Sequence, residues 1–252
     1  MPANGRPRSR KSADMDNSWD KLFQSDFVPA LRRLVEVLEV RLLPAFDNID
    51  AEAKALTGAE WERCMSLPSS GDGCPSDFVD RANDAGASHW MALNNVRQSL
   101  LNLYAPALFH AWEQQLFRFY RLSHLRDGKA CPSKEIDINA VEKHMKSKHI
   151  GLRSFLSWVG IEELRLVAHT VKHAAGRSCA QLKKRRPDLF IPPCLKGKGL
   201  EGNPFACCGK APISDADFYL TLDDLKAYLD ALLLFWDELA NALRKAGLSP
   251  LA

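Results

Sequence analysis

Apolar side chains recur at helical spacing along most of this chain, starting close to Ser18. In the first segment they lie three, four or seven residues apart up to Pro44, which predicts one buried helix face. Ser18 is a candidate N-cap, and Pro29 marks either a helix start or a kink. The apolar positions are Phe23, Phe27, Leu31, Leu34, Val35, Leu38 and Leu42.

The middle of the chain predicts two more long helical regions. One helix is expected over about 49–65, followed by a surface loop over 66–76 that is rich in Ser, Gly and Pro. Ser76 then opens a helical region that we expect to be interrupted before Pro106. A separate helix over 108–125 contains Trp112, Phe117, Phe119 and Tyr120, so it is predicted to lie at the centre of the core.

Shorter helices are predicted in the second half of the chain. They cover 138–148, 152–159, a segment that ends at Gly176 as a C-cap glycine, and 179–186. Residues 187–212 contain too much Pro and Gly for regular structure, and 218–220 read as a short extended piece. Thr221 is a predicted N-cap, with Asp223 and Asp224 in the first turn of a long amphipathic helix over 222–243.

These patterns predict an all-α protein with a single helical domain over residues 18–252 and an irregular loop at 187–212. Residues 1–17 are basic and nearly free of large apolar side chains, so a disordered tail is expected. At 252 residues and 46% hydrophobic composition, the chain can bury a large core. No apolar run is long enough for a bilayer and the N-terminus lacks a signal-peptide core, so we expect a cytoplasmic protein without membrane contact.

Charge is concentrated locally rather than globally. The formal net charge is only +3, and seven scattered cysteines are most simply read as reduced thiols. Positive charge gathers after Gly176, where it could steer an RNA backbone or form a solvated loop face. The residues are Arg177, Lys183, Lys184, Arg185, Arg186, Lys196 and Lys198.

The most informative stretch runs from Glu162 to His173. On a helix, Arg165, His169, Lys172 and His173 share one arc, while Leu164, Val167, Ala168 and Val171 share another. A guanidinium can hold phosphate and an imidazole can exchange a proton near neutral pH, which are the parts that metal-free RNA cleavage needs. The alternative is a solvated helix face. Glu162 lies near the same arc and could orient an imidazole or pair with Arg165.

The run LRLVAHTVKHAAGRS, residues 164–178, followed by LKKRRPDLF, resembles the signature helix of the HEPN superfamily. In that resemblance His173 corresponds to the motif histidine, Arg165 to its arginine, and His169 to a polar position. Seven residues separate Arg165 from His173, a wider spacing than in the family motif. The resemblance implies a HEPN-like bundle, metal-independent endoribonuclease activity of a bacterial toxin or antiphage defence system, a homodimer, and an antitoxin or defence-system protein as partner.

The hypothesis that follows makes RNA the substrate and needs no cofactor. His173 would act as general base or acid, Arg165 would hold the phosphate, His169 would orient it or share the proton transfer, and Lys172 would add positive charge. A zinc site at His169 and His173, completed by His144, His149 or cysteines, is disfavoured because the spacing fits no standard site. The rival hypothesis is a non-catalytic helical module that binds RNA, a nucleotide or a protein partner.

Overall fold

The computed structural model describes residues 18–67, 75–128, 130, 136–173, 176–193, 195–196 and 219–248. Over these residues the chain is all-α and contains no strand, as the periodicity predicts. The α-helices are α1 (Ser18–Leu22), α2 (Val28–Val37), α3 (Ile49–Met65), α4 (Pro75–Arg126), α5 (Ile138–Ser147), α6 (Trp158–His173), α7 (Arg177–Arg185) and α8 (Leu222–Lys245). Two π-helical turns (Phe23–Phe27, Leu38–Leu42) and three 3-10 turns (Leu43–Phe46, Leu152–Ser154, Pro187–Phe190) connect or extend them.

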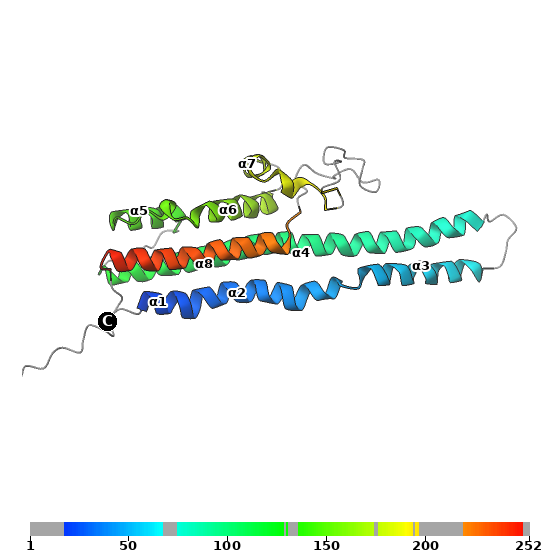
Figure 1. Cartoon of the computed structure of the whole chain (residues 1–252), viewed down its shortest axis with the longest axis horizontal. Coiled ribbons are helices and arrows are strands. Elements are labelled where there is room, and N and C mark those ends of the chain that lie inside the picture. Colours follow the sequence, from blue (N-terminus) through cyan, green and yellow to red (C-terminus); the bar gives the residue numbers. More distant parts are fainter. Residues whose placement is uncertain are drawn as a thin grey trace, which may run out of the picture.

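The long helix α4 organises the bundle (Figure 1). Its 52 residues span about 78 Å at the rise of an α-helix. In Figure 1, α8 lies along its C-terminal half, α1 and α2 lie on one side of this pair, and α5 and α6 lie on the other. The helix α3 packs along the N-terminal half of α4, so these two helices extend beyond the rest as an arm.

Pro106 does not interrupt the helix, contrary to the sequence prediction: α4 continues through it. A proline inside a helix removes one backbone hydrogen bond and costs about 3 kcal/mol. Packing on both sides of the proline offsets that cost, since Ala105, Leu108 and Trp112 are almost completely buried. Tertiary contacts therefore override the local propensity.

The first segment follows its predicted helical course with two π-helical turns that local spacing did not reveal. Ser18, the first described residue, is already helical. Pro29 lies at the second position of α2, directly after the π-helical turn Phe23–Phe27, so it stands inside a continuous helical run rather than at a helix start. The extra residue in each π-turn keeps Phe23, Phe27 and Leu38 turned toward the core, where all three are buried.

Aromatic rings fill the centre of the bundle, as predicted for 108–125. The ring of Phe23 lies 4.8 Å from that of Trp236, and Trp112 meets Phe235 edge-on at 5.2 Å. Such tilted and edge-to-face pairs add to the free energy of burial. The aromatic positions of α4 and α8 thus hold α4, α8 and the π-helical turn Phe23–Phe27 together.

Two boundaries in the second half differ from prediction. Residues 152–159 do not form one helix, because the Glu238 carboxylate accepts hydrogen bonds from Leu156 N (2.8 Å) and from Ser157 N (3.2 Å) and Oγ (2.5 Å). These bonds fix a new helix start at Trp158. Gly176 has an extended backbone (φ 164°) at the start of α7, and is therefore not a left-handed C-cap.

The last helix begins as predicted. Thr221 Oγ1 accepts a hydrogen bond from Asp224 N, and the Asp224 carboxylate accepts one from Thr221 N, which together form a capping box. Tyr219 and Leu220 precede it in a non-helical conformation. The predicted tail 1–17 and residues 197–212 of the predicted loop lie outside the described residues.

Candidate ligand-binding cleft

A cleft of about 550 Å³ lies between the C-terminal half of α4, the start of α5, and α6. Its size falls in the range of small-ligand sites. Its three aromatic side chains come from α4 and α6, and the rest of the lining combines aliphatic, charged and amide side chains. The lining residues are Phe109, Glu113, Phe117, Ile136, Asp137, Ile138, Asn139, Arg153, Trp158, Ile161, Glu162, Arg165 and His169.

Helical periodicity explains the α6 wall of the cleft. Ile161, Glu162, Arg165 and His169 follow one another at three- and four-residue steps and therefore share one face. The opposite side of α6 is the predicted apolar arc, in which Leu164, Val167 and Ala168 are buried. The polar stripe of α6, formed by Arg165, His169, Lys172 and His173, thus faces a cleft along part of its length.

Arg165 is held in the cleft by Glu162. Its Nη2 and Nε donate hydrogen bonds to the Glu162 carboxylate at 2.5 and 3.2 Å. The same contact holds the pKa of Glu162 below its usual value. Of the two roles weighed for Glu162, the structure shows the pairing with Arg165.

His169 is half-buried, and its pKa is lowered, first by burial and then by the positive charges of Arg165, His173 and Lys172. Glu113, across the cleft on α4, acts in the opposite direction. The imidazole is therefore neutral at pH 7 and can accept a proton.

Lys172 and His173 lie outside the cleft lining and are exposed. They continue the same face of α6 by one turn, and the rings of His169 and His173 are 6.1 Å apart. The structure therefore places Arg165 and His169 inside the cleft, and places His173, the predicted motif histidine, at its outer end.

Several cleft residues could not be found by sequence reasoning. Arg153 comes from the 3-10 turn before α6, where its guanidinium lies 5.7 Å from the centre of the Trp158 ring. Its Nε bonds to Glu142, which raises the pKa of the guanidinium. Glu113 comes from α4, and nothing in its local sequence separates it from other surface carboxylates. Only packing brings these residues to Arg165.

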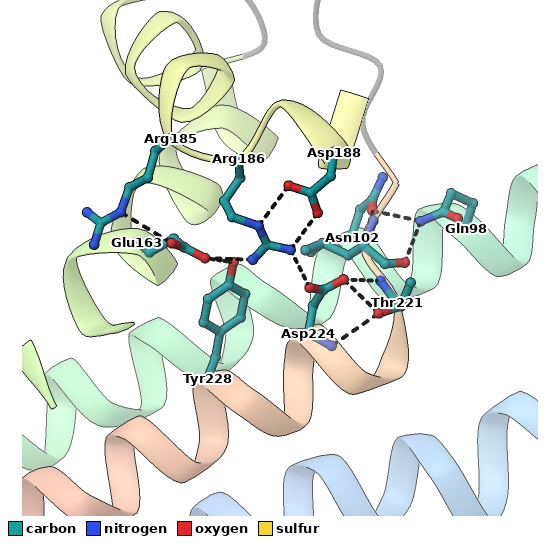
Figure 2. Close-up of polar contacts among 10 residues, drawn as sticks. Gln98, Asn102, Glu163, Arg185, Arg186, Asp188, Thr221, Asp224 and Tyr228 are labelled. Carbon is teal, nitrogen blue, oxygen red and sulfur yellow. Dashed lines mark hydrogen bonds and ion pairs between the residues drawn. The ribbon is translucent and has the colours of Figure 1, made fainter. Parts of the chain in front are cut away.

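The basic segment after Gly176 divides into two groups. Arg177 and Lys184 are exposed, and Lys183 lies over the Phe190 ring at 5.2 Å. Arg185 and Arg186 instead form ion pairs with α6 and α8 (Figure 2). Both belonged to the predicted RNA-contacting residues, but acidic neighbours already neutralise their charge.

Arg186 is the centre of this second cluster. Its guanidinium donates to Glu163 (2.8 Å), Asp188 (2.8 and 2.9 Å) and Asp224 (2.7 Å), and Tyr228 Oη donates to Glu163 at 2.9 Å. Hydrogen bonding to Arg186 lowers the pKa of Asp188, and burial beside Glu163 raises the pKa of Tyr228. Burial raises the pKa of Asp224, but hydrogen bonds from Arg186 and Thr221 lower it by more, so the net shift is downward. Figure 2 shows how the cluster joins α6, the end of α7 and the first turn of α8.

The other candidate histidines lie away from the cleft. His144 is buried, and its Nε2 is 2.9 Å from Ser123 Oγ, with the His124 ring 4.2 Å away. His149 follows α5 in a left-handed conformation (φ 61°). Within the described residues no three His, Cys, Asp or Glu side chains gather in a metal-binding arrangement, and Cys194, Cys207 and Cys208 fall outside those residues.

Comparison with protein families, with curated proteins and with solved structures finds no match to this chain. Among the described helices, none is both long enough and apolar enough to cross a bilayer.

Proposed function

We propose that the cleft beside α6 binds RNA or a nucleotide, and that the chain acts as a helical nucleic-acid-binding module. One observation carries this proposal: Arg165 and His169 line the same cleft of about 550 Å³ as Phe109, Phe117 and Trp158. Arginine is suited to phosphate, and aromatic rings are suited to unstacked bases. The two kinds of contact therefore occur within the reach of one nucleotide.

The guanidinium of Arg165 retains binding capacity despite its ion pair. Nε and Nη2 are used by Glu162, while among the described residues no acceptor meets Nη1. Arginine has five N–H donors, so a phosphate oxygen can be bound without breaking the pair. Glu162 thereby orients the guanidinium.

The proposal is tested by fluorescence anisotropy with a labelled single-stranded RNA at low salt and without divalent cations. Arg165→Ala is expected to weaken binding at least about tenfold, since a charge-assisted contact to phosphate is lost. Arg33→Ala is the matched control: Arg33 lies on α2, with 74% of its side chain exposed, and pairs with Glu36 in the same helical spacing. Circular dichroism checks that both variants are folded.

Two outcomes contradict the proposal. One is the absence of RNA binding by the unaltered chain at low salt. The other is equal weakening by Arg165→Ala and Arg33→Ala, which would assign binding to overall charge. A shallow salt dependence is also expected, because single-stranded RNA gives a slope of about −0.7 per contacted phosphate and the cleft offers few cations.

Metal-independent RNA cleavage is the second candidate function, and the neutral imidazole of His169 beside Arg165 favours it. In this reaction His169 removes the proton of a 2′-hydroxyl, whose oxygen attacks the adjacent phosphorus. The bond to the 5′-oxygen breaks, and that oxygen receives a proton from a second group such as His173. Arg165 stabilises the charge on the phosphoryl oxygens.

Cleavage of single-stranded RNA in EDTA tests this second candidate. His169→Ala and His173→Ala should each abolish cleavage while the circular dichroism spectrum is unchanged. Arg165-dependent binding without cleavage would leave only the binding function. The toxin or defence role, the partner protein and the homodimer belong to the HEPN resemblance, and sedimentation of a strict monomer would contradict the homodimer.

A further inference from the structure

The cleft lining contains more carboxylates than guanidiniums. Glu113, Asp137 and Glu162 line it together with Arg153 and Arg165. Both guanidiniums already bond to a carboxylate: Arg165 to Glu162, and Arg153 to Glu142 at 2.9 Å. Unlike a typical polyphosphate site, this cleft offers little uncompensated positive charge.

We infer that the cleft takes a single nucleotide unit with one phosphate, and that its carboxylates exclude di- and triphosphates. This inference rests on the proposed function and specifies its ligand. One phosphate can bind the N–H donors of Arg165 that Glu162 does not use. Each further phosphate must then be placed among Glu113, Asp137 and Glu162. A phosphate and a carboxylate that share one partly desolvated cleft repel each other.

The aromatic side chains in the lining support a nucleobase as the other half of the ligand. Phe109, Phe117 and Trp158 line the cleft, and the Trp158 ring also lies against the Arg153 guanidinium. The three side chains are 7–9% exposed, so a base would contact the part of each ring that reaches the cleft. A free phosphate uses none of this surface, so it should bind more weakly than a nucleotide.

Glu113 is the residue that can separate this inference from general anion binding. It faces His169 from α4 and has no part in the Arg165–Glu162 pair. Its side chain is 26% exposed, and its nearest basic neighbour is His110 Nδ1 at 3.7 Å. Glu113→Gln therefore removes one negative charge from the cleft while keeping the shape of the side chain.

The experiment is isothermal titration calorimetry of the full chain with adenosine, AMP, ADP, ATP and inorganic phosphate, in EDTA at constant ionic strength. We expect AMP to bind more tightly than adenosine or phosphate, and ATP to bind at least about tenfold more weakly than AMP. In Glu113→Gln the ratio of AMP to ATP affinity should fall severalfold. Glu36→Gln, on α2, is the charge-matched control and should leave this ratio unchanged.

The outcomes separate the two proposals. ATP binding as tightly as AMP, or a ratio unaffected by Glu113→Gln, overturns the single-phosphate inference and leaves the binding function standing. RNA binding that depends on Arg165, with no binding of AMP, has the same consequence. If neither RNA nor any of the nucleotides binds, both proposals are wrong.

Discussion

Arg165 and Glu162 are joined one helical turn apart, with Arg165 Nη2 donating to Glu162 Oε1 at 2.5 Å. The pair orients the guanidinium but also neutralises its charge toward a ligand. About a third of each side chain is exposed, 34% for Arg165 and 32% for Glu162, so the ion pair itself adds little to stability.

Glu162→Gln should therefore strengthen binding of single-stranded RNA by about three- to tenfold, because the charge of Arg165 is no longer compensated. The free energy of unfolding should change by less than about 1 kcal/mol. Anisotropy titration and urea unfolding measure the two effects. Weaker RNA binding in this variant would show that orientation by Glu162 matters more than charge.

RNA binding should become stronger as the pH falls from 7 to 5. The lowered pKa of His169 makes the imidazole neutral at pH 7, and protonation at lower pH adds a positive charge beside the phosphate. The groups that face it are Arg165, Lys172 and His173 on α6 and Glu113 on α4. A uridine dinucleotide is the suitable probe, because neither its phosphodiester nor uracil titrates in this range.

The expected rise in affinity is about threefold to tenfold, and His169→Gln should remove most of it. His173→Gln is the control for the second imidazole. A pH profile that is unchanged in His169→Gln but flat in His173→Gln would place the phosphate at the exposed end of the stripe.

Arg186→Met should destabilise the fold by about 2–3 kcal/mol, because Asp188 and Asp224 then lose their ion-pair partner and Glu163 keeps only Arg185. The value lies below that for a fully buried pair, since 27% of the Arg186 side chain is exposed. Lys184→Met, on the exposed side of α7, should change stability by less than about 0.5 kcal/mol. Equal effects of the two substitutions in urea unfolding would contradict the structural role of Arg186.

Acid should weaken the same cluster. The pKa values of Asp188 and Asp224 are lowered in the folded protein, so both carboxylates contribute stability above their unfolded pKa of about 4. That contribution is lost as the pH falls below about 4 and through the folded values. Unfolding midpoints between pH 6 and 3 should decline less steeply in Asp224→Asn than in the unaltered chain. Parallel curves would contradict this assignment.

Gly58 and Gly86 form a matched pair in the arm made by α3 and α4. A Cβ at Gly86 would lie 2.0 Å from Thr57 Oγ1 and 2.8 Å from the Ala53 carbonyl oxygen, whereas a Cβ at Gly58 would meet nothing within 4 Å. Gly86→Ala should destabilise by about 1–3 kcal/mol, and Gly58→Ala should stabilise by about 0.5–1 kcal/mol. Thermal unfolding measures both. A stabilising Gly86→Ala would show that α3 and α4 do not approach closely at this point.

The sequence alone determined the features that depend on neighbours along the chain. Three- and four-residue spacing predicts the apolar and polar faces of α6, and Thr221 with Asp224 predicts the start of α8. These features are local, because one helical turn relates the residues that produce them.

Only the tertiary structure decided which basic side chains remain free to bind a ligand and which residues of other helices line the cleft beside α6. In the sequence Arg186 belongs to a run of basic residues, but in the fold it is neutralised by Asp224, 38 residues away. Glu113 meets the polar face of α6 from another helix. Pro106 is likewise accommodated by packing against distant helices rather than by its own neighbours. The physical reason is the same in each case: electrostatic and packing free energies depend on distances in space, which helical periodicity does not specify.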